Sequence, residues 1–386
     1  MDSRTGDTGQ RGGQGASQRP QKHEGKADQM NASLGKLLGK GPPPLVGVDI
    51  GSSAIKLVQL SRAGGDYRLE AFGVEALPEN SVSEGVIVDL EAVSSALRQG
   101  VRRFGVSARR CAMAVTGSAV ITKMINLPAN LDEDDIEAQI EVEAGHYIPY
   151  PREEVSLDFE VLGPSPRNAD LLEILLAASK TEHVDMRREV AEMAGLSVQV
   201  VDVESFAVSN AFDLVRQQAG IDESETLAVL NIGSTASSMI VLRGNRSIYN
   251  REHSFGANQL VEECMRRYGM DLNQARFMQR GEEPPAGFED EVLEPFRQSM
   301  IQQISRVLQF YASSSDYMSI NTLYLTGGGA LVPGLAEVLG DEIGISTELG
   351  DPLKHVRLAP KINARQLDLV RPSLTIACGL ALRGFD

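Results

Sequence analysis

The sequence predicts an α/β protein built from two similar halves that face one cleft. Three observations predict this class: a strand–turn–strand unit at 45–60, a second copy at 227–242, and a glycine-rich turn after a strand at 326–334. A repeated unit indicates a duplicated structure. The chain of 386 residues also exceeds one typical hydrophobic core, so two or more domains are expected.

The first unit is an apolar run that ends in an acidic residue and a tight turn. Its β-branched residues predict a buried strand, with Asp49 near the end. Gly51 allows backbone N–H groups to approach a phosphate, and Ser52 and Ser53 add hydroxyl donors. A plain Gly-Ser hairpin is the alternative when this unit is taken alone.

The second unit repeats the first at a constant offset. Asn231 takes the place of Asp49, and Gly233 takes the place of Gly51. The candidate phosphate-binding residues of the second turn are Gly233, Ser234, Thr235 and Ser237. The repeat therefore predicts two phosphate-binding turns that converge on one cleft.

The third informative segment is the glycine-rich turn. Gly327, Gly328 and Gly329 follow a predicted strand and leave no side chain to block a flat ligand. A helix beyond them would present free N–H groups to a phosphate. A turn needed only for tight packing is the alternative for this motif alone.

The other elements follow from apolar periodicity and turn residues. Those expected before the second unit are a hairpin turn at 64–65, a helix at 90–104, strands at 111–115 and 120–128, a helix from 132, strands at 155–161 and 171–178, a helix at 183–194, a strand at 198–204 and a helix at 205–217. Those expected after it are a hairpin turn at 244–245, helices at 256–268 and 296–311, a strand at 322–326, a helix from about 333 and a buried helix at 372–383.

Composition excludes several classes of function. The net charge of −16 argues against nucleic-acid binding, which needs a basic face. No apolar stretch approaches the roughly 20 residues that span a bilayer, and no signal peptide opens the chain. The three cysteines and five histidines lack the spacing of disulfides or metal ligands, so we expect reduced thiols in a cytosolic protein.

Residues 1–44 differ from the rest of the chain. They are rich in Gly, Gln, Ser and Lys and nearly free of aromatic and β-branched residues, so we expect a disordered tail. Within it, residues 30–40 are either a linker or a short amphipathic segment that touches a membrane or a partner. Met30 is an alternative start of translation.

Taken together and in this order, the three motifs resemble those of the actin-like ATPase superfamily. Residues 49–56 resemble its first phosphate motif, 231–238 its second and 327–329 its adenosine motif; residues 202–212 and the final helix resemble its connecting segments. Within the superfamily, the chain resembles the PilM family of type IV pilus assembly proteins. The segments that carry this resemblance are 46–60, 125–128, 143–151, 154–155, 194–196 and 202–206.

The resemblance implies an actin-like fold, which is a duplicated ribonuclease-H-like fold, with an inserted subdomain like that of the division protein FtsA. The implied parts are half I (subdomain 1A) at 45–117 and 197–225, the inserted subdomain (1C) at 118–196, half II (subdomain 2A) at 226–255 and 320–386, and a helical subdomain (2B) at 256–319.

The resemblance also implies a function. Proteins like PilM bind ATP or ADP with Mg²⁺ at the cytoplasmic face of the inner membrane and bind the cytoplasmic N-terminal peptide of the inner-membrane protein PilN. They form a homo-oligomeric ring coupled to other platform and motor proteins, and reach the membrane only through partners. We therefore expect a scaffold for pilus biogenesis and twitching motility, with the peptide groove in or beside the inserted subdomain.

Site roles carry over residue by residue. Asp49 would hold Mg²⁺ through water, and Asn231 occupies the corresponding metal position. Backbone N–H groups at 51–53 and 233–235 would cradle the phosphates, with help from Ser237.

Two roles stay open at this stage. Lys56 would balance phosphate charge or only pair with Asp49. Glu204, at a strand-to-helix junction between the halves, would position the attacking water or only cap the helix.

Asn231 departs from the family pattern, because relatives usually carry Asp there. An amide oxygen is a weaker metal ligand and cannot act as a base, so we expect ATP binding with weak or absent hydrolysis. One alternative is an FtsA-like, filament-forming division or cytoskeletal protein, for which a membrane-binding C-terminal helix is expected and residues 382–386 supply none. Another is a small-molecule kinase, which would need a further carboxylate base.

Overall fold

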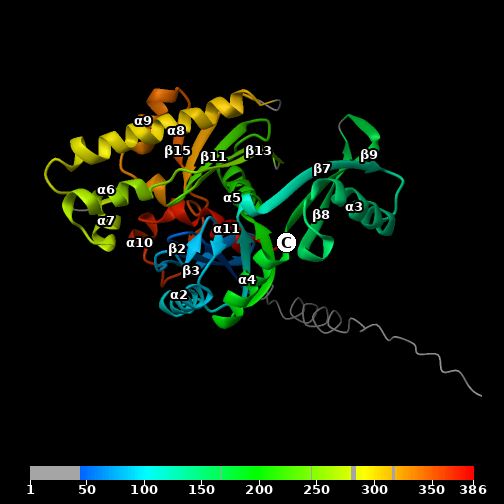
Figure 1. Cartoon of the computed structure of the whole chain (residues 1–386), viewed down its shortest axis with the longest axis horizontal. Coiled ribbons are helices and arrows are strands. Elements are labelled where there is room, and N and C mark those ends of the chain that lie inside the picture. Colours follow the sequence, from blue (N-terminus) through cyan, green and yellow to red (C-terminus); the bar gives the residue numbers. More distant parts are fainter. Residues whose placement is uncertain (1–43, 166, 245, 280–283, 315–317) are drawn as a thin grey trace, which may run out of the picture. The chain divides into compact units, whose positions relative to one another are not determined.

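The described part of the chain contains two large sheets, a three-stranded sheet and a two-stranded one (Figure 1). The computed structural model describes residues 44–386 except 166, 245, 280–283 and 315–317. The predictions for the tail before residue 44, and the predicted turn position Asn245, lie outside the described residues. Within the described part, no helix combines the length and the apolar character that crossing a membrane requires.

The first sheet combines an antiparallel meander with parallel strands. Its order is β10–β6–β1–β2–β3–β16, with β1, β2 and β3 antiparallel and β6 and β10 parallel to β1. Every residue of β1 is buried, as expected for a strand covered on both faces. The strands are β1 (Leu45–Ile50), β2 (Ala54–Ala63), β3 (Asp66–Ala76), β6 (Arg110–Val115), β10 (Ser197–Val203) and β16 (Arg357–Leu358).

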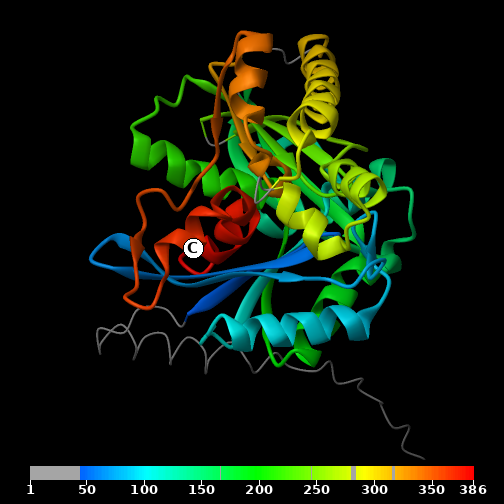
Figure 2. The same cartoon turned by 90° about the vertical axis from the view of Figure 1, so that its left-hand side faces the viewer.

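Helices cover both faces of the first sheet. On one face lie α2 (Leu90–Arg103) and α4 (Thr181–Met193), and on the other lie α5 (Glu204–Ala219) and α11 (Thr375–Leu382). Figure 2 shows α11 in red and α2 in cyan on opposite sides of the blue strands. The helix α4 contacts β6 and β10 of the first sheet as well as β8 and β9 of the inserted sheet, and α11 contacts β1, β2 and β6.

The second sheet has the same topology as the first. Its order is β13–β12–β11–β14–β15, again an antiparallel meander flanked by parallel strands. The strands are β11 (Thr226–Ile232), β12 (Ser237–Arg243), β13 (Arg246–His253), β14 (Thr322–Thr326) and β15 (Ser346–Leu349). The helices packed with it are α6 (Asn258–Tyr268), α7 (Leu272–Gln279), α8 (Glu294–Ala312) and α9 (Leu335–Ile343).

Strand register confirms the predicted repeat. Asp49 pairs with Lys56 across β1 and β2, and Asn231 pairs with Ser238 across β11 and β12. The turns match as well: the N–H of each turn glycine donates to the carbonyl three residues later, at 3.1 Å in the first unit and 2.9 Å in the second. The two halves therefore present equivalent turns.

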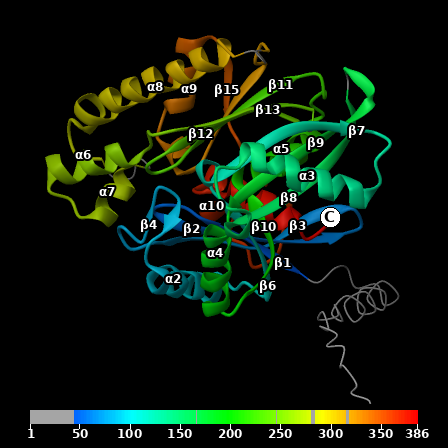
Figure 3. The same ribbon diagram turned by 45° about the vertical axis from the view of Figure 1, so that its right-hand side comes forward.

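The inserted subdomain is a separate small sheet with one helix. Strands β7 (Val120–Pro128), β9 (Asn168–Lys180) and β8 (Val155–Ser165) are antiparallel, and α3 (Glu133–Tyr147) lies across them (Figure 3). Its core consists of Ile125, Leu127, Ile136, Ile140, Ile174 and Leu176. The predicted cap is confirmed, because the Asp132 side chain accepts the N–H of the third residue of α3.

Short elements join these parts. The hairpin of β4 (Val82–Ser83) and β5 (Val86–Ile87) precedes α2. The single-turn helix η1 (Gly117–Ala119) links the first sheet to the inserted sheet. The remaining short elements are η2 (Arg152–Glu154), η3 (Glu289–Leu293), η4 (Gly328–Leu331), α10 (Ala364–Asp368) and η5 (Arg371–Leu374).

Candidate functional site

A cavity of about 910 Å³, called here the cleft cavity, is lined by both strand turns and by the glycine-rich turn. Every residue that the sequence indicated for phosphate, adenosine, metal or water lines it. Segments more than 270 residues apart are thus brought to one place by the duplicated sheets. The predicted site residues therefore line one cavity, which is the arrangement that the repeat predicted.

The two phosphate turns touch each other across the cleft cavity. The hydroxyl oxygens of Ser52 and Thr235 lie 3.3 Å apart. Backbone hydrogen bonds hold the second turn to the start of α6. The N–H of Ala257 donates to the Gly233 carbonyl at 3.0 Å, and the N–H of Asn258 donates to the Ser234 carbonyl at 2.8 Å. Ser237 is buried and its hydroxyl donates to the Phe255 carbonyl at 2.8 Å.

An ion pair lies beside the first turn. Lys56 Nζ is 3.1 Å from Asp49 Oδ2, and the Asp49 carboxylate is buried. The same ammonium lies over the turn, 2.6 Å from the point that a Cβ on Gly51 would occupy. Lys56 therefore pairs with Asp49 while also lining the cleft cavity. In the second half the equivalent pair, Asn231 and Ser238, is neutral.

Glu204 is the first residue of α5 and lines the cleft cavity. The cap position belongs to Val203, so Glu204 does not cap the helix through its side chain. Burial, followed by the negative charge of Asp49, raises the pKa of Glu204 to about 8, while Arg187 and Lys56 oppose the shift. The raised pKa of Glu204 favours the protonated form of its carboxyl group.

Asn231 packs against the glycine-rich turn. Its Oδ1 accepts from the Thr326 hydroxyl at 3.5 Å. Gly327 has φ +85°, and a Cβ there would lie 2.7 Å from Asn231 Oδ1 and 2.4 Å from the Ile232 carbonyl oxygen. Only glycine fits this position, because both the backbone conformation and the space exclude a side chain.

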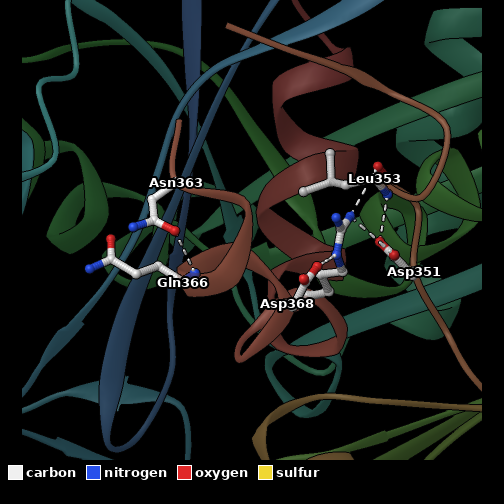
Figure 4. A network of polar contacts seen from close by, with 6 residues as sticks. Asp351, Leu353, Asn363, Gln366 and Asp368 are labelled. Atoms are coloured by element: carbon white, nitrogen blue, oxygen red, sulfur yellow. Dashed lines mark hydrogen bonds and ion pairs between the residues drawn. The ribbon is translucent and has the colours of Figure 1, made fainter. Parts of the chain in front are cut away.

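Residues of α10 and η5 form another wall of the cleft cavity. Asn363 caps α10 by accepting the Gln366 N–H at 3.2 Å, and both side chains line the cleft cavity. Arg371 binds Asp368 at 2.7 Å, Asp351 at 3.3 Å and the Leu353 carbonyl at 3.2 Å (Figure 4). Burial raises the pKa of Asp351. The contacts of Arg371 with Asp351 and Leu353 hold η5 to the connection between β15 and β16.

Sequence reasoning missed several residues of the cleft cavity. Glu252, Arg276, Asn363 and Gln366 line it but follow no motif. They lie on separate elements, and no spacing in the sequence relates them to one another.

The donor set fits a metal held mainly by phosphates. Among the described residues, no three His, Cys, Asp or Glu side chains are grouped to hold a metal ion. The acidic residues Asp49, Glu84, Glu204 and Glu252 nevertheless line the cleft cavity. Mg²⁺ usually takes one or two carboxylates plus substrate phosphates and waters, which suits this arrangement.

A second cavity, of about 160 Å³, lies between the inserted sheet and α4. It is lined by Ser118, Ala119, Ile121, Ile148, Tyr150, Val155, Ala178, Ser179, Lys180 and His183. Lys180 Nζ lies 4.8 Å from the centroid of the Tyr150 ring. The His183 Nδ1 atom is buried and has no hydrogen-bond partner among the described residues. The second cavity therefore combines apolar walls with polar groups.

Comparisons with known proteins agree with this geometry. A family model described as type IV pilus assembly protein PilM matches residues 47–385. In the solved PilM–PilN type IV pilus biogenesis complex, one chain is 28% identical with a TM-score of 0.74, over 89% of this chain and 98% of that chain. The ethanolamine utilization protein EutJ from Carboxydothermus hydrogenoformans is 17% identical with a TM-score of 0.52, over 89% and 90%, and supports the fold alone. The predicted actin-like fold is confirmed, and the chain belongs to the family of type IV pilus assembly proteins PilM.

Proposed function

We propose that this chain is a nucleotide-binding scaffold of the type IV pilus assembly platform that binds a cytoplasmic peptide of an inner-membrane partner. The observation that carries the proposal is the meeting of the two equivalent turns, at Ser52 and Thr235, within one cavity. Such turns offer backbone N–H groups and hydroxyls to phosphates. The glycine-rich turn supplies a flat, open surface for an adenosine group.

The nucleotide would be ATP or ADP with Mg²⁺. The 51–53 and 233–235 turns would cradle the phosphates, with the Ser237 hydroxyl, already bonded to a carbonyl, shaping the second turn. Lys56 would balance phosphate charge once Mg²⁺ competes for Asp49. Gly327, Gly328 and Gly329 would face the adenosine.

Hydrolysis would be slow or absent. Asn231 supplies a neutral amide where a carboxylate would bind metal or activate water. Glu204 would orient an attacking water, and its raised pKa favours the protonated carboxyl group, which cannot act as a general base. Nucleotide binding would then act as a structural signal and not as an energy source.

The second cavity is the proposed site for the partner peptide. It lies at the border of the inserted subdomain and half I, and its apolar walls suit side chains of an extended peptide. The similar protein was solved in a PilM–PilN complex, which supports PilN as the partner. The family resemblance makes the cytoplasmic N-terminal peptide of PilN the proposed ligand. Recruitment by such a partner would hold the chain at the cytoplasmic face of the inner membrane, in a homo-oligomeric ring with motor proteins, in support of pilus biogenesis and twitching motility.

The test is a calorimetric titration of the full chain with the N-terminal cytoplasmic peptide of PilN from the same organism, with and without Mg-ATP. Saturable binding that a scrambled peptide does not reproduce is the expected result. Absence of binding in both states would contradict the scaffold role. A separate titration with Mg-ATP alone tests the nucleotide site, so the two parts of the proposal fail independently.

A further inference from the structure

Strand β3 has an open outer edge along most of its length. Its ladder with β2 continues to Ala76, whereas β16 pairs only with Arg68 and Leu69. Among the described residues, β16 is the last strand on this side of the first sheet, so the part of β3 after Leu69 has no strand beside it. An edge of this kind presents unpaired N–H and C=O groups, which native proteins usually cover or block.

A hydrogen bond next to β3 identifies the backbone groups that form the open edge. The Leu77 N–H donates to the Ser53 carbonyl at 3.0 Å, so the backbone groups of Leu77 face β2. Backbone groups alternate between the two sides of a strand, so those of Phe72, Val74 and Ala76 face away from β2. The same three residues line the cleft cavity. None of them is a proline or a charged residue, the types that block an edge.

Two segments form walls on either side of this edge. Phe104 follows α2, and a Cβ on Gly73 would lie 2.0 Å from its ring, so the glycine allows the ring to lie against β3. Ile362, just before α10, packs in one cluster with Phe72 and Val74. We call the edge groove the part of the cleft cavity that is lined by this edge and by Arg103, Phe104, Lys361, Ile362 and Gln366.

The charged groups of the edge groove are basic. Arg103 and Lys361 are exposed, and Lys361 Nζ donates to the Gly105 carbonyl at 3.1 Å, which joins the two walls. The nearest carboxylate, that of Glu75, is buried and lies 3.6 Å from the Arg103 guanidinium. Glu75 does not line the cleft cavity, and the acidic residues that do belong to other elements. A ligand in the edge groove therefore meets backbone donors and acceptors, two cations and apolar walls.

We propose that the edge groove binds an extended, acidic segment of a partner protein, which joins the first sheet as a strand beside β3. Hydrogen bonds to Phe72, Val74 and Ala76 would supply main-chain affinity. Side chains alternate along a strand, so one set would contact Phe104 and the other Ile362. The basic side chains favour acidic residues in the segment. This site is separate from the second cavity, and the proposal requires neither a nucleotide nor the PilN peptide.

The first test uses a synthetic probe without nucleotide. The probe is a blocked peptide of alternating Glu and Val, about six residues long, which is a common strand length. We expect saturable binding to the full chain in calorimetry, with a Kd below about 1 mM, and slower hydrogen exchange at 70–77. The same peptide with N-methyl groups on alternate residues keeps its charge but cannot pair as a strand, and we expect it not to bind.

Two substitutions at one position test the backbone contact. Val74→Pro removes an N–H group that faces the edge groove and leaves the ladder with β2, since proline is tolerated where the N–H of an edge strand has no partner strand. Val74→Thr is the matched control, because it changes the side chain and keeps the N–H. We expect Val74→Pro to lose the Glu-Val peptide and Val74→Thr to bind it.

Charge reversal tests the preference for an acidic segment. Lys361→Glu should weaken binding of the Glu-Val peptide by about tenfold or more, because like charges then face each other. Arg365→Glu is the matched control, since Arg365 is exposed on α10 and does not line the cleft cavity. We expect its affinity for the peptide to equal that of the natural chain.

Three results would overturn the proposal. One is the absence of binding of the Glu-Val peptide to the natural chain. Another is equal binding of the N-methylated peptide, which would show electrostatic adsorption without strand pairing and which decides the question if Val74→Pro does not fold. The third is an equal loss of affinity in Lys361→Glu and Arg365→Glu, which would place the contact outside the edge groove.

Discussion

Ser52 and Thr235, which are 183 positions apart in the chain, bring their hydroxyl oxygens to 3.3 Å across the cleft cavity. Each residue lies in the turn of one copy of the repeated unit, so the contact joins the two halves at their equivalent points. A ligand with several phosphates would be held by both turns at once. The cleft is therefore a product of the duplication and belongs to neither half alone.

Adjacent glycines of the glycine-rich turn should respond differently to substitution by alanine. Gly327→Ala should lower the free energy of unfolding by about 2 kcal/mol or more, because Gly327 has positive φ and no space for a Cβ. Gly328→Ala should leave it unchanged, since a Cβ there meets no atom within 4 Å, and should weaken nucleotide binding instead. Denaturant unfolding and calorimetry measure the two effects. Equal loss of stability in both variants would contradict this assignment.

Asn231→Asp should raise the rate of ATP hydrolysis. A carboxylate in this place can bind metal or take a proton, and such a group typically contributes roughly a hundredfold to a rate. Phosphate release from purified protein is the measurement, with Asn250→Asp on an exposed position of β13 as the control. A rate that stays at the natural level would show that the amide does not limit turnover.

Folding stability should depend on pH through Asp213 of α5. Burial raises the pKa of Asp213 to about 6, while Arg216 opposes the shift. Because the folded state binds the proton more tightly than the unfolded chain, the stabilising contribution of this proton is lost as pH rises from about 4 to about 6. The free energy of unfolding of Asp213→Asn, taken relative to that of the natural chain, should therefore be higher at pH 7 than at pH 4. Asp341→Asn, at an exposed residue of α9, is the control, and identical shifts in both variants would contradict the role of Asp213.

Two tyrosines offer a matched pair for the peptide site. Tyr150 is 41% exposed, contacts Lys180 and lines the second cavity; Tyr147 is 40% exposed, contacts Lys123 and does not line it. Tyr150→Ala should weaken binding of the PilN peptide by about tenfold, the effect of losing a contact of 1.4 kcal/mol. Tyr147→Ala should leave the affinity unchanged. Equal peptide affinities of the two variants in calorimetry, or a larger loss of affinity in Tyr147→Ala, would contradict the proposed groove.

The parts of the fold that were predicted share one property: their signals are local. The repeated unit shows its strands, its turn and its Asp49 or Asn231 within 16 residues. The inserted strands follow from apolar runs, and α3 follows from its capping residue. The predicted helices at 90–104 and 296–311 are confirmed as α2 and α8 within a few residues. The predicted strands at 155–161 and 171–178 are longer in the structure, because β8 and β9 continue past an irregular pairing at Gly163.

The parts that were not predicted depend on partners that carry no sequence signal. Arg187 is bound by three backbone carbonyls, and any residue can supply a carbonyl. Glu252 and Gln366 reach the cleft cavity from β13 and α10, whose positions follow only from tertiary packing. Likewise, the packing of α4 and α11 on the first sheet could not follow from their order in the chain.

The most direct test of the central claim is a calorimetric titration of the full chain with Mg-ATP, repeated with Gly51→Ala and with Gly233→Ala. A Cβ on Gly233 would lie 2.5 Å from the Ala236 carbonyl oxygen and would disturb the second turn. A Cβ on Gly51 would lie 2.6 Å from Lys56 Nζ, so it would displace the Lys56 ammonium and place a methyl group in the first turn. If both turns cradle one nucleotide, the natural chain binds one Mg-ATP and either substitution abolishes that binding. No binding by the natural chain, or full binding after one turn is disturbed, would contradict the account.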